Sequence, residues 1–417
     1  MHHLVVGAGP AGVTACETLR QLDPSAHITL LCGESGEPYG RMAIPYYLVG
    51  NIDEAGTRLR KRPGYWESLR ISLRHDRVAA LAPDDDRVTL ESGETLDFDR
   101  LLIATGAHPV SPAISGIDLP GVVHCWTLED ARAIAERAAE GSDVVLMGAG
   151  FIGCIILESL VKRGVKLTVI EQGPRMVPRM LDAVAGGMLQ AHCESQGVRV
   201  LTRTRAEAIT EAEGRLTVAT SQGEIAADLV IVATGVRSNT GFLDCSGVEC
   251  DQGVLVDEQL QSSRAGVFAA GDVAQGPDLL SGSRQVHAIQ PTAVEHGRIA
   301  AHNMVGQGAR YPGSLNMNIL DTLGLVSVSF GNWEGGDAHH ALVLDNRDAG
   351  RYLKLVFDEQ DRLRGAIAVG HTEKVGVLRG LIQSRRPLHG WRERLQRDPT
   401  RLAEAFVAMP LAQAVKA

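Results

Sequence analysis

The sequence lacks the features that mark membrane, secreted or nucleic-acid-binding chains. Its longest uncharged apolar run, residues 144–157, is about 14 residues long and contains three glycines, whereas a membrane span needs about 20 residues. No basic segment precedes the first apolar stretch at Leu4, as a signal peptide would require. The net charge of -9 argues against a nucleic-acid ligand held by overall basicity. These absences predict a cytoplasmic protein with neither a membrane nor a nucleic acid as its partner.

Cysteine is too sparse and too scattered for a disulfide framework. The chain has seven cysteines in 417 residues, and this odd number favours a reducing compartment. Only Cys245 and Cys250 show the C-x4-C spacing of a redox pair. Adjacent histidines occur at residues 2–3 and 339–340, but no cysteine or carboxylate stands near them at zinc-site spacing. We therefore predict no metal.

Glycine, by contrast, is abundant. The chain has 46 glycines in 417 residues, about 11% compared with an ordinary ~7%. Glycine weakens helices and strands, so an excess needs a reason, and one reason is backbone that passes close to a ligand. The length predicts two or three domains. The 44% of hydrophobic and 22% of charged residues are typical of a soluble globular protein.

One pattern occurs twice along the chain. Residues 2–22 and 143–163 each contain an apolar strand, a G-x-G-x-x-G motif and a helical pattern. Residues 99–107 (DRLLIATGA) and 228–236 (DLVIVATGV) each open with aspartate and carry a buried strand that ends in Ala-Thr-Gly. Two such repeats predict two similar nucleotide-binding domains of the α/β class.

The glycine motifs have a mechanical explanation. The first glycine makes a tight turn, the second lets the backbone approach a pyrophosphate, and the third lets the helix pack close to the strand. The phosphate then lies at a helix N-terminus, which favours negative charge. About 20 residues after each motif stands a glutamate that could accept the hydroxyls of a ribose, Glu34 and Glu171. The alternative for both is a solvated carboxylate at a strand end.

Two dinucleotide sites in one chain indicate a flavin and a nicotinamide. Glu171 favours NADH over NADPH, because a 2′-phosphate would meet its carboxylate. Arg175 and Arg179 lie close by in the sequence and keep NADPH as the alternative. A third signal is GVFAAGDVA, residues 266–274, where a strand ends at Gly271 and Asp272 and a helix is expected to begin. Asp272 could accept hydrogen bonds from a polyol.

Together the motifs resemble those of the FAD-dependent pyridine nucleotide–disulfide oxidoreductase superfamily, over about residues 3–380. The motifs, in the family's order, are residues 7–12, 104–109, 148–153, 233–239 and 266–274. Three further stretches resemble the branch of rubredoxin reductases, NADH oxidases and nitrite reductase flavoproteins: residues 39–52, 291–306 and 352–382.

The resemblance implies two Rossmann-like domains followed by a C-terminal α+β interface domain. The implied boundaries are residues 1–112 and 239–310 for FAD, 113–238 for NADH, 311–390 for the interface domain and 391–417 for a helical tail. The residues implied for FAD are Gly7, Gly9, Pro10, Ala11, Gly12, Glu34, Arg41, Val78, Thr105, Gly106, Gly271, Asp272, Gln290 and Pro291. Those implied for NADH are Gly148, Gly150, Phe151, Ile152, Gly153, Glu171 and Gly235.

Departures from the family pattern narrow the chemistry. Met42 stands where one branch of the family has its redox cysteine, and a thioether cannot form a thiolate or a sulfenate. The Cys245–Cys250 pair falls in a surface excursion that lies far from the flavin in the family fold. Tyr46 and Ile155 replace a lysine and a glutamate that many relatives carry near the two rings. Hydride transfer from NADH to the flavin requires no acid–base residue, so the catalytic residues are unknown.

Tyr46 and His287 are candidates for a supporting role beside the flavin, and the alternative for both is packing. With no redox cysteine, the electron acceptor is expected to be an external small redox protein of the rubredoxin or ferredoxin type. Its docking site would be a basic segment, residues 58–70 or 385–397, although solvated arginines are the alternative.

Other functions remain open at this point. The chain could be an NADH oxidase that reduces O2 or a sulfur species, or a flavin-bearing subunit or redox-sensing interaction protein. A homodimer is a further option. The tail has a helical apolar rhythm at Leu402, Phe406 and Met409, which would serve a partner surface or pack back onto the interface domain.

Overall fold

The computed structural model describes residues 1–388 and 390–408. Its contacts divide the chain into two compact units. The first unit contains Met1–Val110, Trp126–Ala131 and Gly235–Ser314. The second contains Ser111–Cys125, Arg132–Thr234 and the chain from Leu315 onward. The three-domain assignment made from the sequence stays a prediction, because this division does not separate the interface domain from residues 132–234.

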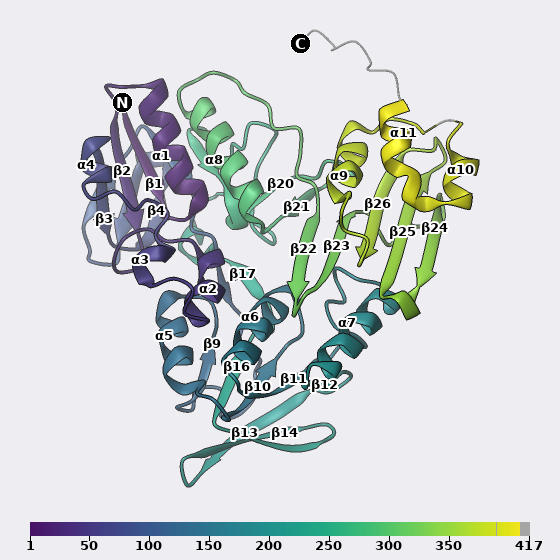
Figure 1. Cartoon of the computed structure of the whole chain (residues 1–417). Coiled ribbons are helices and arrows are strands. Elements are labelled where there is room, and N and C mark those ends of the chain that lie inside the picture. Colours follow the sequence, from purple (N-terminus) through teal and green to yellow (C-terminus); the bar gives the residue numbers. More distant parts are fainter. Residues whose placement is uncertain (389, 409–417) are drawn as a thin grey trace. The chain divides into compact units, whose positions relative to one another are not determined.

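The first unit is built on a five-stranded parallel sheet (Figure 1). In spatial order its strands are β19 (Val267–Ala269), β7 (Arg100–Ile103), β1 (His2–Val6), β2 (His27–Cys32) and β3 (Ile71–His75). The central strands are buried apolar runs, as expected of a parallel sheet covered on both faces. Helices α1 (Pro10–Leu22) and α8 (Gln290–Met304) pack against each other so closely that a Cβ on Gly297 would lie 2.2 Å from the Ala11 carbonyl oxygen.

Smaller elements complete the first unit. Its antiparallel strands are β4 (Val78–Ala82), β5 (Arg87–Leu90), β6 (Thr95–Asp97), β8 (Ala107–Pro109), β17 (Val236–Ser238), β20 (Ala274–Pro277) and β21 (Arg284–Val286); the short strand β18 (Val254–Leu255) pairs parallel with β20. Its short helices are η1 (Arg41–Ala43), α2 (Ile44–Leu48), α3 (Glu54–Thr57) and α4 (Tyr65–Ser68). The helix expected directly after Asp272 is wrong: a single 3-10 turn, η4 (Gly271–Val273), leads into β20, because this segment pairs with its neighbouring strands instead.

A second parallel sheet forms the core of the second unit. In spatial order its strands are β12 (Arg199–Leu201), β11 (Lys166–Ile170), β10 (Asp143–Met147), β16 (Leu229–Val232) and β9 (Val122–His124). Helix α6 (Phe151–Lys162) follows β10, and α7 (Ala183–Ser195) precedes β12. Helix α5 (Leu128–Arg137) begins in the first unit and ends in the second.

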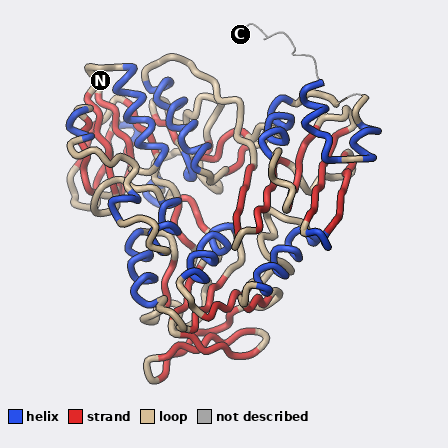
Figure 2. Tube along the Cα trace, viewed as in Figure 1, coloured by secondary structure: helices blue, strands red, loops and turns tan. Residues whose placement is uncertain are grey.

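An antiparallel meander covers part of one face of this second sheet. It consists of β13 (Ala206–Ala212), β14 (Arg215–Thr220) and β15 (Gly223–Ala227), all drawn as strands in Figure 2. Its apolar residues Ile209, Val218 and Ile225 share one core cluster with Val145 and Ile170 of the sheet. The meander therefore seals the carboxyl-terminal part of the sheet face by apolar packing.

The C-terminal part of the second unit is an antiparallel sheet with helices packed on it (Figure 1). Its strands in spatial order are β22 (Met317–Thr322), β23 (Leu325–Gly331), β26 (Leu363–Val369), β25 (Arg351–Asp358) and β24 (His339–Asn346). Its helices are α9 (Val375–Ser384), α10 (Arg392–Arg397), η6 (Pro399–Arg401) and α11 (Leu402–Ala408). None of the helices in the described part of the chain combines the length and hydrophobicity of a membrane span.

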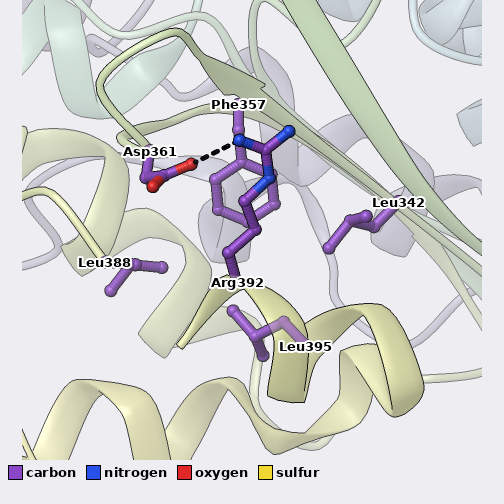
Figure 3. Close-up of a pocket in the computed structure, with 6 residues that line it drawn as sticks. All are labelled: Leu342, Phe357, Asp361, Leu388, Arg392 and Leu395. Atoms are coloured by element: carbon purple, nitrogen blue, oxygen red, sulfur yellow. Dashed lines mark hydrogen bonds and ion pairs between the residues drawn. The ribbon is translucent and has the colours of Figure 1, made fainter. Parts of the chain in front are cut away.

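The described part of the tail packs back onto this C-terminal sheet. Leu395 of α10 lies with Leu342 and Phe357 of the sheet (Figure 3). Beside them, the Arg392 guanidinium lies 3.4 Å from the Asp361 carboxylate. Leu402 is buried as well, whereas Met409, the last residue of the predicted apolar rhythm, lies outside the described residues. Up to residue 408 the predicted apolar rhythm is therefore divided, because Leu402 is buried whereas Phe406 is 43% exposed.

Helix α7 carries a glycine that the fold does not need. Gly187 is exposed within the helix, and a Cβ built there would meet no atom within 4 Å. Gly187→Ala is therefore expected to raise the free energy of unfolding by about 0.5–1 kcal/mol, because alanine loses less backbone entropy on folding. Urea unfolding measures the change. The matched control is Gly186→Ala, whose Cβ would lie 3.0 Å from the Met176 carbonyl oxygen and should give no gain.

Candidate functional site

The glycine loop after β1 has the steric demands that the sequence predicts. Gly7 has φ +112°, and a Cβ there would lie 2.1 Å from the Ala104 carbonyl oxygen. A Cβ on Gly12 would lie 1.9 Å from the Gly7 carbonyl oxygen. Gly9 is different, since a Cβ there would meet no protein atom within 4 Å. The first turn of α1, which starts at Pro10 and Ala11, has no acidic residue and no side-chain cap. An anion fits this open, uncapped helix N-terminus.

The turn at Gly271 and Asp272 lies beside this loop. A Cβ on Gly271, which has φ +77°, would lie 3.2 Å from the Ala11 Cβ and 3.4 Å from the Ala293 Cβ of α8. The helix that lies beside this turn is α8, which starts at Gln290, and it is a different helix from the one predicted to begin directly after Asp272. In the part of the chain described here, no group donates a hydrogen bond to the Asp272 carboxylate, and burial raises its pKa. Such a carboxylate is suited to accept hydrogen bonds from a polyol.

Glu34 and Arg41 lie together, although the sequence assigns them to separate parts of the cofactor. The Arg41 guanidinium is 2.7 Å from one Glu34 oxygen, and the Tyr39 hydroxyl donates to the other at 2.5 Å. Arg41 also donates to the Trp126 carbonyl oxygen at 2.8 Å and lies 5.1 Å from the Trp126 ring centre. Tyr39 and Trp126 were missed by the sequence analysis. Trp126 is 85 residues from Arg41, so no local pattern could connect them.

The remaining residues predicted for FAD occupy three places in the first unit. The Thr105 hydroxyl donates to the Asn239 carbonyl oxygen at 2.9 Å, and Gly106 has φ +67°. Val78 is the first residue of β4 and is nearly buried. Gln290 and Pro291 form the first turn of α8. The start of α8 lies close to the Gly271 turn, because Ala293 packs against Gly271. Among the described residues, Val78 shows no contact with the glycine loop.

The two supporting candidates differ in their surroundings. Tyr46 is 58% exposed and Met42 is 51% exposed, so neither packs in the core. His287 is buried, and its Nε2 lies 3.1 Å from an Asp278 carboxylate oxygen. Burial alone would raise the pKa of Asp278, but the adjacent His287 imidazole and hydrogen bonds from Ser281 lower it to about 2. His287 therefore has an acidic partner, and its role toward the flavin stays a prediction.

His296 on α8 is a further buried imidazole that the sequence analysis missed. Its Nδ1 accepts the Gly271 N–H at 3.4 Å, and its Nε2 lies 3.4 Å from the Ser314 hydroxyl. Burial, helped by nearby His287, lowers the pKa of His296 to about 3. The neutral ring thus ties α8 to the turn that carries Asp272. A helix-face histidine two residues after a valine and one before a glycine gives no signal of this contact in the sequence.

The glycine loop after β10 repeats the geometry of the first loop. Gly148 has φ +102°, and a Cβ there would lie 2.5 Å from the Ala233 carbonyl oxygen. A Cβ on Gly153 would lie 2.1 Å from the Gly148 carbonyl oxygen, whereas Gly150 faces open space. Helix α6 begins at Phe151 and Ile152 with no acidic residue in its first turn and no side-chain cap. A second phosphate group fits here.

Glu171 is fixed beside this second loop. Its carboxylate accepts the N–H of Ala149 at 2.8 Å and the N–H of Gly173 at 2.6 Å. Arg175 is occupied in donating to the Leu181 carbonyl oxygen at 2.8 Å, while Arg179 is exposed. The carboxylate next to the loop favours a ribose with free hydroxyls.

Gly235, also predicted for NADH, is the first residue of a segment of the first unit and has φ +133°. The structure therefore brings six of the seven predicted NADH residues together in the second unit: Gly148, Gly150, Phe151, Ile152, Gly153 and Glu171.

Each of the two basic segments has one arginine in an ion pair and several exposed cations. In residues 58–70, Arg58, Lys61 and Arg62 are exposed, while Arg60 pairs with Glu17 at 2.5 Å. In residues 385–397, Arg392 is engaged with Asp361, as described above. The exposed basic side chains outside these ion pairs include Arg58, Lys61 and Arg62 in the first segment and Arg385, Arg394 and Arg397 in the second.

The cysteines form no redox centre in the structure. All seven lie in the described part of the chain and are thiols, and only Cys245 and Cys250 are exposed. Within residues 1–388 and 390–408, no group of three His, Cys, Asp or Glu side chains is arranged to hold a metal ion.

Comparison with known proteins matches two family models to the chain. Residues 1–297 match the pyridine nucleotide-disulphide oxidoreductase model, and residues 317–386 match the rubredoxin NAD+ reductase C-terminal domain. The chain is 30% identical to the NADH-dependent phenylglyoxylate dehydrogenase subunit epsilon of Aromatoleum evansii, over 98% of this chain and 95% of the relative. It is also 30% identical to the ferredoxin--NAD(+) reductase component of the biphenyl dioxygenase system of Paraburkholderia xenovorans (strain LB400), over 97% and 98%.

A solved structure, the water-forming NADH oxidase from Lactobacillus brevis bound to NADH, is similar with a TM-score of 0.86 and 25% identity. The alignment covers 93% of this chain and 92% of that one. These matches confirm the predicted fold, with two Rossmann-like domains and a C-terminal domain, and the predicted FAD and NADH cofactors. The family match spans more than half of the sequence, and the chain belongs to the pyridine nucleotide-disulphide oxidoreductase family, as an FAD-dependent NAD(P)H oxidoreductase.

Proposed function

We propose that this protein is an NADH-dependent reductase of a small electron-transfer protein of the rubredoxin or ferredoxin type. A bound FAD would supply the chemistry, as an acceptor of hydride from NADH and a donor of electrons one or two at a time. The polypeptide binds and orients the two dinucleotides and keeps water away from them. No side chain is required to move a proton in hydride transfer.

Different residues of the first unit would bind different parts of FAD. Gly7, Gly9 and Gly12 with the start of α1 would hold the pyrophosphate, and Asp272 would accept the ribityl hydroxyls. Glu34, already paired with Arg41, would have to share its carboxylate with a ribose hydroxyl. The smaller contributions would come from Pro10, Ala11, Val78, Thr105, Gly106, Gly271, Gln290 and Pro291.

In the second unit the Gly148–Gly153 loop would hold the NADH pyrophosphate at the start of α6. Glu171 would accept the adenosine ribose hydroxyls from its place beside Ala149. Its charge would oppose a 2′-phosphate, so NADH is the preferred donor. Gly235 would contribute from the end of its strand.

The choice of a small redox protein as the acceptor is supported by Met42 together with one similarity. The chain is similar over 97% of its length to a ferredoxin--NAD(+) reductase component. Where a relative with thiol chemistry needs a cysteine, this chain has a thioether, which cannot carry electrons to a disulfide or a peroxide. The electrons must therefore pass to an acceptor outside the chain without a cysteine at position 42 as a relay.

A second candidate function is supported by the relative from Aromatoleum evansii, a subunit of an NADH-dependent dehydrogenase that is similar over 98% of this chain. The protein would then be the NAD-side flavin subunit of a larger complex, and its electron-transfer partner would be another subunit. NADH oxidase activity is the third candidate, since the chain also resembles such an enzyme.

One anaerobic series separates the main proposal from the oxidase. The FAD-loaded protein is mixed with NADH or NADPH while flavin absorbance is followed, and the reduced protein is then offered O2, a rubredoxin or a ferredoxin. Fast bleaching by NADH and fast reoxidation by a redox protein, with slow reoxidation by O2, support the main proposal. Fast reoxidation by O2 alone supports the oxidase. Faster bleaching by NADPH than by NADH would contradict the role given to Glu171.

Docking of an acidic redox protein at residues 58–70 would depend on charge. We expect Arg58→Glu combined with Lys61→Glu to lower kcat/KM for the protein acceptor about tenfold at low ionic strength, because steering by opposite charge is lost. The difference should vanish near 0.5 M salt. Ferricyanide reduction, which needs no docking, should be unchanged.

The matched control for this docking test is Arg351→Glu combined with Arg379→Glu, two exposed arginines outside the segment. An equal loss in both double variants would show that only net charge matters. Rates independent of salt in the unmodified protein would rule the segment out as a docking site.

A further inference from the structure

A cavity of about 280 Å³ lies in the second unit away from the glycine loop. Its lining residues come from strands β10, β11 and β12, from the turns that precede β11 and β12, and from the edge of the meander: Asp143, Val144, Val165, Lys166, Leu167, Thr168, Gly197, Arg199 and Ala226. Asp143 and Lys166 are the first residues of β10 and β11. Because these strands are parallel, the cavity lies at their amino-terminal edge, whereas the Gly148–Gly153 loop and Glu171 follow their carboxyl ends.

The polar side chains of the cavity stand on one face of the sheet. Asp143 is the register partner of Lys166, and Thr168 is the register partner of Arg199. Lys166 and Thr168 are two positions apart on β11, so they also share a face. Four polar residues from three neighbouring strands therefore project to the same side.

This side is the one that the meander covers only in part. Val145 is the register partner of Thr168, and Val145 packs in the core cluster formed with the meander. The meander covers the carboxyl-terminal rows of the sheet, and Ala226 at its edge lines the cavity. Lys166 and Arg199 remain exposed beyond its edge, and Thr168 is half-buried.

The charges around the cavity are not balanced. The Asp143 carboxylate is engaged by the Arg215 guanidinium, which also lies 3.9 Å from Asp228. No carboxylate within 4.0 Å pairs with Lys166 or Arg199 in residues 1–388 and 390–408. The cavity is thus lined by the Thr168 hydroxyl and by two cations without a carboxylate partner, Lys166 and Arg199. The charge of the Asp143 carboxylate at its rim is neutralised by Arg215.

We propose that this cavity binds the phosphate group of a small phosphorylated ligand. A guanidinium donates two parallel hydrogen bonds to phosphate oxygens, an ammonium adds a point charge, and a threonine hydroxyl donates a further bond. The volume is near the lower limit of small-molecule pockets, about 300–1,000 Å³, so it suits a phosphate group with a few more atoms. The Asp143 carboxylate, at the rim, would accept a hydroxyl of a phosphate ester.

The test measures thermal unfolding of the FAD-loaded protein with saturating NAD+, so that both predicted pyrophosphate sites are occupied. The probes are inorganic phosphate and glycerol 1-phosphate at 20 mM, each compared with sodium chloride of equal ionic strength. A site of millimolar affinity should raise the Tm by about 2 °C or more. Equilibrium dialysis with labelled phosphate should show one bound anion per chain. The probe with the larger effect distinguishes free phosphate from a phosphate ester as the ligand.

The variant for this test is Lys166→Gln combined with Arg199→Gln, which should abolish both the Tm shift and the extra bound anion. Its matched control is Arg351→Gln combined with Arg379→Gln, which removes the same charge elsewhere and should retain both. Equal Tm values in phosphate and chloride would overturn the proposal, as would a shift that persists in the Lys166 and Arg199 variant. Thr168→Val offers a second, uncharged variant and should weaken binding several-fold.

Discussion

Gly150→Ala is expected to raise the KM for NADH on the order of 10- to 100-fold while the Tm moves by less than about 1 °C. A Cβ at Gly150 meets no protein atom within 4 Å, and its backbone, φ -75° and ψ -173°, is open to alanine. The protein alone therefore gives no reason for glycine at this position. The added methyl group weakens NADH binding only, because a pyrophosphate would approach the backbone where the methyl group stands. Steady-state kinetics with ferricyanide as acceptor measure the KM.

The neighbouring glycine provides the opposite result. A Cβ on Gly153 would lie 2.1 Å from the Gly148 carbonyl oxygen, so Gly153→Ala should displace α6 and lower the Tm by several degrees. The same chemical change at Gly187, in an exposed stretch of α7, serves as the control for the KM, which it should leave unchanged. An unchanged KM in Gly150→Ala would mean that the NADH phosphates do not pass this residue. That result would remove the Gly148–Gly153 loop from the proposed NADH site.

These two glycines show why part of the site is readable from the sequence. Tight turns and close helix packing admit only glycine, so Gly7, Gly12, Gly148 and Gly153 leave a fixed spacing in the chain. The strand before each motif and the glutamate after it are local in sequence as well. The fold class and both dinucleotide loops follow from such local constraints.

Contacts between distant segments leave no comparable pattern. Arg41 donates a hydrogen bond to Trp126, which is 85 residues away. The same guanidinium pairs with the Glu34 carboxylate, which sequence reasoning assigns to a ribose alone. No helix begins directly after Asp272; the helix beside that turn is α8, which the chain reaches only after a hairpin. Whether an apolar residue is buried also depends on tertiary packing, as the exposed Tyr46 shows.

Acidification from pH 6.5 to 4 is expected to lower the free energy of unfolding by about 3 kcal/mol through His296. The pKa of this buried imidazole is lowered to about 3, whereas an unfolded chain binds the proton near pH 6.5. Between these values the unfolded state holds more protons than the folded state, so stability falls as the pH falls. Buried His3, whose pKa is lowered to about 4 by burial, acts in the same direction with a smaller contribution.

Urea unfolding of the FAD-loaded protein at a series of pH values measures this slope. His296→Gln should flatten it, because an amide can still accept the Gly271 N–H and donate to Ser314 but does not titrate. His27→Gln, which removes an exposed imidazole from the same unit, should leave the slope unchanged. Because His296 holds the turn that carries Asp272, loss of flavin fluorescence quenching, which reports released FAD, should follow the same pH curve. A slope that is identical in His296→Gln and the unmodified protein would show that this imidazole is not held neutral, and the tie between α8 and the Asp272 turn would then have to rest on the packing of Ala293 alone.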